Sequence, residues 1–424
     1  MTAATETAPR IVTLDVLRGV AVMGILAMNI VAFAMPFLAY QNYAVYGGDD
    51  ATDLWAWILS SVFVDGKMRA MFSLLFGASM LLVIERADAS GGNSKSVHIR
   101  RMLWLLVFGL IHYYLIWLGD ILTGYALIGL LAFLFRRKTT KQLFKWSMIF
   151  FGLAVLLYTL MFGSVVALEM AATAPGASPE LQQQWKEAQR NMGAPAPEKI
   201  QEEIARHQGS YAGVVDHKVR NEAFLPLVTT IMFGPETLAF MLLGMWGLRS
   251  GFVTGDWEAR RYTRIAVTNI LIGTAGFAVI TWLIMQSNFA FGTTLALNMA
   301  VGAILRPIMM TGYVALIVLL LKKASGDGPL TSRIAAAGRA AFTNYLGTSI
   351  LMTGLFYGWG LGLYGSLDRA QLYLVVLAMW AIMLLWSKPW LQRYRYGPFE
   401  WLWRSLARGG RQPMRKGPAP VPAE

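Results

Sequence analysis

Two pairs of polar residues stand at the same spacing within apolar stretches of the chain. Asp15 and Arg18 open one stretch, and Asn29 lies inside it, eleven residues after Arg18. His112 follows Arg101 by the same interval in another stretch. Eleven residues are close to three helical turns, so each pair lies on one helix face, about 16 Å apart along the axis. Such a face suits a long amphipathic ligand that enters from one side, because charges near hydrocarbon are retained for function.

His112 is the candidate general base. An imidazole titrates near neutral pH, and a carboxylate on one ring nitrogen orients it and raises its basicity. Asp120, at the turn that follows, is the expected partner, with another acid as the alternative. The structural interpretation is a neutral histidine that bonds a neighbouring helix.

Glu236 and Arg306 are each next to a proline, Pro235 and Pro307. Counted inward from the outer surface, both lie roughly 18–20 Å deep. A buried carboxylate and a buried guanidinium at one depth are predicted to pair, since either alone is costly. Each proline frees backbone carbonyls, which is tolerated where a helix lines a cavity. A purely structural ion pair is the alternative.

Three further polar residues begin apolar stretches. Arg69 follows Asp65-Gly66-Lys67 at the outer face, where it either snorkels to the membrane surface or binds substrate. Arg100 joins Arg101 at the inner end of its stretch. Asn344 either makes an interhelical hydrogen bond or contacts substrate.

The composition identifies a membrane protein. Of 424 residues, 56% are hydrophobic and 14% charged, and the mean hydropathy is +0.48. A soluble protein of this size could not bury that much apolar surface. The net charge of +13 does not indicate a nucleic-acid partner, because nearly every Lys and Arg lies in alternate short loops. There is no Cys, and the four His form no pair at metal-binding spacing, so no metal site is predicted.

Repeated apolar runs near 20 residues predict an all-α polytopic protein with ten spans. The expected spans are Val16–Leu38, Met68–Ile84, Met102–Leu118, Ile121–Phe135, Leu143–Leu168, Phe224–Leu248, Ile265–Met285, Thr293–Leu321, Ile334–Phe356 and Leu372–Leu391. Leu54–Val64 is too short to span and is expected to be interfacial.

The loop charges predict that both termini are cytoplasmic, since the basic loops alternate with short loops that carry almost no Lys or Arg. The first outer loop is acidic, with Asp49, Asp50, Asp53 and Asp65. The resulting parts are a cytoplasmic N-terminus (1–15), a first bundle of five spans (16–170), an outer loop (171–223), a second bundle of five spans (224–391) and a C-terminal segment (392–424). With a single Arg10 and no cleavable signal pattern before it, the first helix is expected to be an uncleaved anchor.

Two of these parts have predictable local structure. In the outer loop, Pro179 and Pro197 each occupy the first position of an expected helix, and the loop is expected to cap the outer mouth. Near the C-terminus, Tyr396–Leu406 is typical of an interfacial helix. The Gly/Pro/Arg-rich tail from Gly409 is expected to be disordered.

Five segments together resemble the bacterial YeiB family of integral membrane proteins, also described as DUF418. They are Leu14–Asn29 (LDVLRGVAVMGILAMN), Asp65–Ser79 (DGKMRAMFSLLFGAS), Phe108–Tyr125 (FGLIHYYLIWLGDILTGY), Gly338–Tyr345 (GRAAFTNY) and Tyr396–Arg404 (YGPFEWLWR). The match runs from the first span to the tail, and it makes the second bundle DUF418-like. The resemblance implies a multi-pass protein of the bacterial plasma membrane.

The first helix is also similar to that of the transmembrane acyltransferase superfamily, which includes heparan-α-glucosaminide N-acetyltransferase and the acyltransferase-3 proteins. Acyltransferase-3 members carry an Arg and, after ten residues, a His; here these positions hold Arg18 and Asn29. The heparan enzyme's family has Asn there as well, and basic residues of the third helix, like Arg100 and Arg101, bind acyl-CoA in acyltransferase-3 proteins. The heparan enzyme's catalytic His follows in the outer loop, whereas this chain has no His between Met35 and Asp53.

These features lead to two hypotheses of function. In the first, the protein passes an acyl group from cytosolic acyl-CoA to an acceptor at the outer face. Arg18, Arg100 and Arg101 hold the nucleotide end and Asn29 bonds the thioester carbonyl. His112 takes the acceptor's proton and is tuned by Asp120 or Glu236.

In the second hypothesis, the protein is a transporter or lipid flippase with a midplane site around Glu236 and Arg306. A non-catalytic partner of an envelope enzyme is a third option. The partners expected are membrane lipids and a small-molecule, glycan or lipid acceptor, with no nucleic acid. A homodimer is the oligomer to test.

Overall fold

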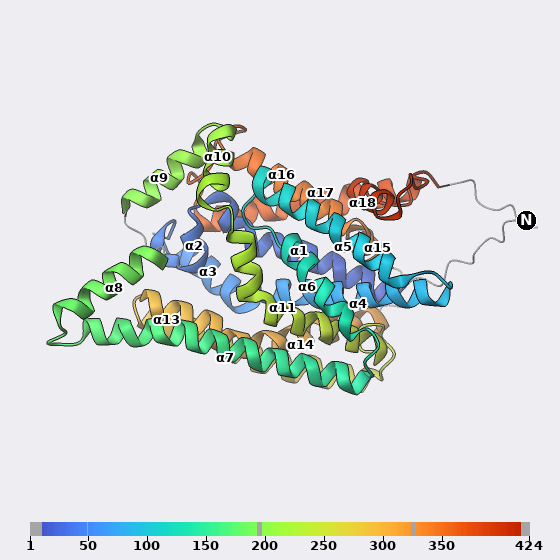
Figure 1. The fold of residues 1–424 in the computed structure, drawn as a ribbon, viewed down its shortest axis with the longest axis horizontal. Helices are drawn as coiled ribbons and strands as arrows, with labels where there is room; N and C mark the ends of the chain where they lie inside the picture. The colour runs from blue at the N-terminus through green and yellow to red at the C-terminus, as the bar shows by residue number, and fades with distance from the viewer. Residues whose placement is uncertain (1–10, 49, 193–196, 324–327, 417–424) are drawn as a thin grey trace, which may run out of the picture.

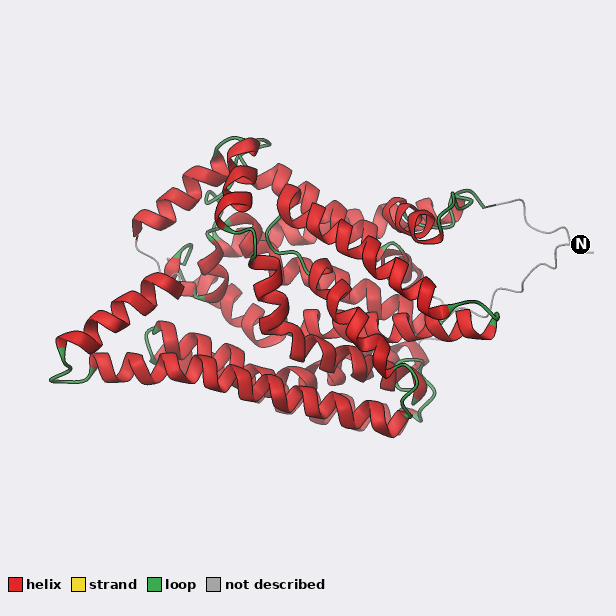
Figure 2. Ribbon diagram, viewed as in Figure 1, coloured by secondary structure: helices red, strands yellow, loops and turns green. Residues whose placement is uncertain are grey.

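A computed structural model describes residues 11–48, 50–192, 197–323 and 328–416, and within these ranges the chain is helical with no strand (Figures 1 and 2). The long helices are α1 (Val12–Ala34), α4 (Lys67–Ala89), α5 (Ser94–Ile111), α7 (Thr140–Thr173), α11 (Leu225–Arg249), α12 (Ala259–Gln286), α14 (Gly302–Lys323) and α17 (Arg369–Arg393). The shorter helices are α2 (Phe37–Gln41), α3 (Ala51–Phe63), α6 (Leu122–Ala132), α8 (Pro179–Met192), α9 (Pro197–Gln208), α10 (Tyr211–Asn221), α13 (Phe291–Ala296), α15 (Pro329–Arg339), α16 (Ala341–Phe356) and α18 (Pro398–Arg408).

The protein is a polytopic all-α membrane protein. In the described part of the chain, eight helical stretches are long and apolar enough to cross a membrane, compared with the ten spans that we predicted. The difference lies in two short elements. The predicted span over Ile121–Phe135 is an apolar helix of 14 residues (Leu122–Phe135), and the one over Ile334–Phe356 is broken at Ala340 into α15 and α16.

Close helix packing surrounds a buried first helix. α1 is the most deeply buried of the eight long stretches and contacts α4, α15, α16 and α17. α11 packs along α4 and α7. The α4–α11 contact depends on Gly77 and Gly244, because a Cβ at either position would run into the backbone of the other helix at Met241 or Leu74. Small residues that allow backbones to approach are typical of helix pairs in membranes.

Two of the helices contain π-helical turns. α5 continues beyond Ile111 as the π-helical turn η2 (His112–Ile116), and a second such turn, η4 (Leu297–Val301), joins α13 to α14. Turns of this kind occur frequently at functional sites, because they shift the register of the side chains that follow. Each adjoins a polar residue that the sequence had singled out, His112 in η2 and Arg306 one turn after η4.

The break between α15 and α16 is stabilised from the C-terminal segment. Glu400 of α18 is buried, and its carboxylate accepts hydrogen bonds from the Phe342 and Thr343 backbone nitrogens, at 2.7 and 3.0 Å, and from the Thr343 hydroxyl. These nitrogens belong to the first turn of α16, where backbone donors lack intrahelical partners and a negative charge is favourable. The segments GRAAFTNY and YGPFEWLWR therefore contact each other directly.

We expect Glu400→Gln to destabilise the protein by about 1–3 kcal/mol, because the amide loses the charge-assisted bonds to the α16 N-terminus. The thermal midpoint of the purified protein in detergent measures this effect. Glu258→Gln is the matched control, because Glu258 is the exposed N-cap residue of α12 and its side chain makes no cap hydrogen bond. Equal midpoints for the Glu400 variant and wild type would show that the cap contributes nothing.

The outer loop contains the two helices that we predicted and one that we missed. α8 and α9 begin at Pro179 and Pro197 as expected, whereas α10 was not anticipated. Figure 1 places α8, α9 and α10 at one end of the molecule and α15 and α18 at the other. This arrangement agrees with the predicted topology, in which the loop and the C-terminal segment lie on opposite sides of the membrane.

The C-terminal segment differs from the expectation at its tail. The interfacial helix is present as α18, but Gly409–Lys416 is not disordered. It folds back so that the backbone nitrogen of Arg395 donates to the Met414 carbonyl at 2.9 Å and the backbone nitrogen of Lys416 donates to the Arg393 carbonyl at 3.2 Å. The amino-acid composition of the tail could not predict this backbone pairing with the end of α17. The expectation for residues 417–424 lies outside the described residues, as do residues 1–10 before the first helix.

α9 is fixed by a buried histidine that predicts a pH response. His207 is 4% exposed, its Nδ1 donates to the Glu203 carbonyl at 2.8 Å, and its ring stacks on Tyr364 at 4.4 Å. Burial, and to a lesser degree the neighbouring Arg206 and Lys218 charges, lower the pKa of His207 from 6.5 to about 4.

Because the undocked loop binds the proton more readily than the docked one, docking is fully stable above about pH 6.5 and weakens as the pH falls toward 4. We expect residues 197–208 to become protease-sensitive over this range. The comparison with His207→Phe, which keeps an aromatic ring but cannot titrate, isolates the effect. An unchanged pH response in that variant would assign it to another group.

Candidate functional site

His112 and Asp120 form a buried dyad at the outer end of α5. His112 is the first residue of η2, and its Nδ1 lies 3.0 Å from Asp120 Oδ1. Both side chains are at most 1% exposed. The Asp120 carboxylate also accepts from the Leu122 and Thr123 nitrogens, at 3.0 and 2.8 Å, so it caps the N-terminus of α6 and has a fixed orientation.

This geometry determines which ring nitrogen is free to react. Asp120 as an acceptor places the proton of a neutral imidazole on Nδ1, so Nε2 keeps its lone pair. Within the described residues, Nε2 is buried and has no hydrogen-bond partner. A buried polar atom left without a partner is uncommon and requires an explanation. The predicted contact between His112 and Asp120 is confirmed, and the carboxylate orients the imidazole.

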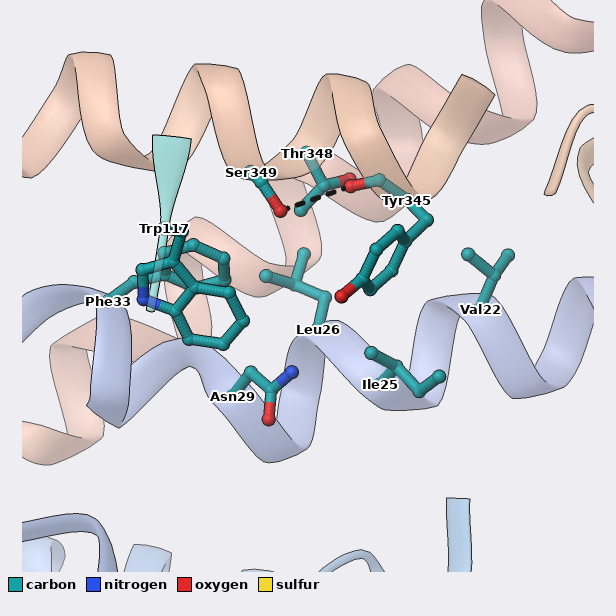
Figure 3. A pocket seen from close by; sticks show the side chains of 9 residues that line it. All are labelled: Val22, Ile25, Leu26, Asn29, Phe33, Trp117, Tyr345, Thr348 and Ser349. Atoms are coloured by element: carbon teal, nitrogen blue, oxygen red, sulfur yellow. Dashed lines mark hydrogen bonds between the residues drawn. The ribbon is translucent and has the colours of Figure 1, made fainter. Parts of the chain in front are cut away.

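Asn29 lies in a small pocket beside this dyad (Figure 3). The pocket is lined by α1 residues, by Trp117 and by α16 residues, namely Val22, Ile25, Leu26, Asn29, Phe33, Trp117, Tyr345, Thr348 and Ser349. It has room for about one water molecule. The buried Thr348 hydroxyl is another atom without a partner among the residues that the structure describes. Asn29 and Thr348 thus supply polar groups to the pocket, beside the hydroxyls of Tyr345 and Ser349.

Two aromatic side chains connect His112 to the pocket. The His112 ring centroid lies 5.2 Å from that of Tyr345 and 6.3 Å from that of Trp117, and both rings line the pocket. Trp117 also stacks on Phe33 at 3.8 Å. The imidazole therefore packs against two side chains that line the Asn29 pocket, which places the ends of the two eleven-residue pairs in one region.

The outer loop covers the turn that carries His112. Tyr113 and Tyr114 donate hydrogen bonds to the backbone carbonyls of Glu222 and Ala223, at 2.8 and 2.6 Å. Lys218 of α10, which is buried, donates to the Tyr113 carbonyl at 3.2 Å. The end of the loop therefore holds η2 through three hydrogen bonds.

A second cluster surrounds Glu236. The predicted ion pair is present, since Arg306 Nε lies 2.8 Å from Glu236 Oε1. Arg69 Nη2 lies 3.0 Å from Glu236 Oε2, so the carboxylate is held between two guanidinium groups. The interpretation of Arg69 as a snorkelling residue is wrong, because this buried anion attracts the side chain inward. Tyr158 donates to the same carboxylate at 3.4 Å.

The basic residues expected to hold a nucleotide lie at the inner ends of their helices, with no contact between Arg18 and the others among the described interactions. Arg18 pairs with Asp15 at 3.0 Å and donates to Ser79. Arg101 stacks its guanidinium over Trp403 of α18 at 4.2 Å. The Arg100 guanidinium lies against Gly409, so it too faces the C-terminal segment.

Asn344 makes the interhelical bonds that the structural interpretation predicts. Its amide nitrogen donates to the Ala337 carbonyl at 3.0 Å and to Ser387 at 3.3 Å, and its oxygen accepts from Trp386 at 2.9 Å. The side chain is thereby saturated, and we leave Asn344 out of the candidate site.

Sequence reasoning missed Trp117, Tyr345 and Thr348 as pocket residues. Aromatic and hydroxyl side chains in an apolar helix have no distinctive spacing, so the pattern alone did not separate them from core residues. The position of Trp117 and Tyr345 within the segments Phe108–Tyr125 and Gly338–Tyr345 was the available signal.

Comparisons with known proteins find full-length relatives. A family model described as "Protein of unknown function (DUF418)" matches residues 247–410. YxaH of Bacillus subtilis is 34% identical over 97% of this chain and 98% of its own length, and YeiB of Escherichia coli is 32% identical over 94% and 96%. A 39.9 kDa protein from the amylase 3′ region of Bacillus acidopullulyticus is 27% identical over 96% of both chains. No solved structure matches.

Proposed function

The chain belongs to the family of YeiB and YxaH, which carries the DUF418 domain, and on this premise we propose that it is a membrane acyltransferase with His112 as its general base. The names of these relatives assign no reaction. The observation that carries the proposal is the unpartnered Nε2 of His112, which Asp120 orients beside a pocket lined by Asn29. The bacterial inner membrane, with acyl-CoA supplied from the cytosol, is the proposed location.

The acyl donor is the substrate whose carbonyl enters the pocket. A carbonyl oxygen occupies about the space of one water molecule, which is the space available next to Asn29. The Asn29 amide nitrogen donates a hydrogen bond to that oxygen and stabilises the negative charge that develops on it during attack. The acyl chain and the pantetheine arm extend from there toward the inner face, along α1.

The proton moves through His112. Nε2 accepts the proton of the acceptor's hydroxyl or amine as its heteroatom attacks the thioester carbon, and Asp120 stabilises the imidazolium that forms. Collapse of the tetrahedral intermediate breaks the carbon–sulfur bond, and His112 returns the proton to the departing CoA thiolate. The products are the acylated acceptor and free CoA, so atoms and charge balance.

At the inner end, Arg18, Arg100 and Arg101 are proposed to bind the nucleotide phosphates. The observation that favours a phosphate partner is the basic character of the α5–α18 contact, where Arg101 lies close to Arg404 and Arg408. Phosphate groups neutralise such a cluster. Substrate binding here requires the acyl-CoA to span from this end to Asn29.

The experiment incubates the purified protein with radiolabelled acetyl-CoA and longer acyl-CoAs. We expect saturable binding that is at least tenfold weaker in Arg18→Ala and unaffected by Arg264→Gln, an exposed residue of α12. No binding of any acyl-CoA, or binding indifferent to Arg18→Ala, contradicts the proposal.

The second candidate function, a transporter or lipid flippase, is favoured by the Arg69–Glu236–Arg306 cluster between helices that carry Pro235 and Pro307. Substrate flux in proteoliposomes that is lost in Glu236→Gln, without any acyl-CoA binding, would select this function. Acyl-CoA turnover would select the first.

A further inference from the structure

We propose that Arg69 binds an oxyanion, a phosphate or carboxylate group, which in the proposed acyltransferase belongs to the acceptor. The role in catalysis rests on the proposed function, whereas the binding of the anion does not. The inference starts from the different ways in which the two arginines around Glu236 use their nitrogens.

Arg306 is fully engaged with the protein. Its Nε donates to Glu236 at 2.8 Å, and its Nη1 and Nη2 donate to the Asn298 and Met299 carbonyls of η4, at 3.3 and 3.2 Å. The side chain is 7% exposed. The π-helical turn thus supplies the carbonyls that hold Arg306, whose function is to balance the Glu236 charge.

Arg69 is only partly engaged. Its Nη2 donates to Glu236 at 3.0 Å and its guanidinium lies over the Phe233 ring at 5.1 Å, while no hydrogen bond from Nε or Nη1 is present within the described residues. The side chain is 20% exposed, compared with 0% for Glu236. A partly exposed guanidinium with two nitrogens that make no hydrogen bond within the described residues matches the paired oxygens of a carboxylate or phosphate.

The charges around Arg69 favour an anion. Arg69 and Arg306 share the single carboxylate of Glu236, so the two guanidinium groups carry one more charge than the anion between them. Lys67 is fully buried, and its Nζ lies over the Phe277 ring at 3.2 Å, so the side chain is held beside the two arginines. In surroundings of low polarity, an uncompensated positive charge strongly favours a bound anion.

Gly66 lies in close contact with the Arg306 side chain. Its backbone has a φ of +71°, and a Cβ there would lie 2.6 Å from Arg306 Cδ. The turn that presents Lys67 and Arg69 therefore lies directly on Arg306. The positions of both cations depend on one local conformation.

The helix α6 connects the Arg69 region with the dyad. Tyr125 of α6 has its hydroxyl 2.6 Å from Ser73 Oγ and 3.4 Å from the Arg69 carbonyl. Asp120, which orients His112, precedes Tyr125 by five residues and caps the N-terminus of the same helix. In the proposed acyltransferase, the acceptor places its anionic group on Arg69 and its hydroxyl or amine at His112.

The test measures anion binding without any acyl-CoA. Inorganic phosphate is titrated into the purified full-length protein in detergent, with chloride at equal ionic strength as the reference. We expect saturable stabilisation that falls at least tenfold in affinity in Arg69→Gln, is partly kept in Arg69→Lys and is unchanged in Arg264→Gln.

Two further arms complete the design. In phosphatidylcholine nanodiscs phosphate should still bind, and loss of that binding when phosphatidylglycerol is added would identify the headgroup phosphate as the occupant of the same site. Phosphate binding that is equal in wild type and in a folded Arg69→Gln, or no binding under any of these conditions, would overturn the proposal. Neither result depends on whether the protein transfers acyl groups.

Discussion

His112→Gln should lower the rate of acyl transfer by about a hundred- to ten-thousand-fold while acyl-CoA still binds. Glutamine fills a similar volume but cannot accept and release the acceptor's proton, and the proposed Arg18, Arg100 and Arg101 contacts are untouched. The measurement compares initial rates of CoA release with acyl-CoA affinity in the same preparations. An unaltered rate in the folded variant would remove His112 from the chemistry.

Asp120→Asn provides a sharper version of this experiment. An asparagine oxygen can still accept from the Thr123 nitrogen, which bonds Asp120 Oδ2. The amide nitrogen then replaces Oδ1, the atom that contacts both His112 Nδ1 and the Leu122 nitrogen, and it donates to Nδ1, which moves the imidazole proton to Nε2. The base is then blocked, as when the orienting carboxylate of a catalytic triad is amidated. We expect a rate loss comparable to that of His112→Gln, together with a lower thermal midpoint because the Leu122 nitrogen loses its acceptor.

Glu236→Ala should destabilise the fold by about 3–5 kcal/mol, because it leaves Arg69 and Arg306 facing each other in the bundle without their shared carboxylate. Thermal unfolding in detergent, monitored by circular dichroism, measures this effect. Glu85→Ala is the matched control, since this carboxylate pairs with Arg249 at 2.9 Å but is 42% exposed, and such pairs contribute at most about 1 kcal/mol.

The combined variant Glu236→Ala/Arg306→Met tests the physical reason. Removing one cation together with the carboxylate relieves the excess charge, so the double variant should recover part of the lost stability. A double variant less stable than the sum of the single ones would show that Arg306 stabilises the bundle through η4 rather than through Glu236.

The sequence predicted best those features that follow from membrane thickness, backbone geometry and the cost of burying charge. Apolar runs located the long helices because each must cover a fixed membrane thickness, and Pro179 and Pro197 marked two helix starts through their fixed backbone angle. The Glu236–Arg306 pair followed from depth and from the cost of burying either charge alone. The full-length relatives confirm the family that five separated motifs indicated.

The remaining features depend on contacts between distant segments. Whether Arg69 turns outward or inward is decided by Glu236, 167 residues away, and the break at Ala340 is stabilised by Glu400. The short α6 and α16 contribute to the core without the length of a full span, so hydropathy alone counted them as two more spans. The third outer helix, α10, is fixed by Lys218 and the tyrosines of η2, and none of these contacts leaves a local pattern.

The release of CoA from acyl-CoA is the most direct test of the central claim, that the His112–Asp120 dyad catalyses acyl transfer. The chain has no Cys, so a thiol reagent detects free CoA with no background from the protein itself. With membrane extract as the source of acceptor, we predict CoA release by the wild type that is lost in His112→Gln and in Asp120→Asn. Equal release from wild type and both variants, or none from the wild type with any acyl-CoA, would contradict the claim.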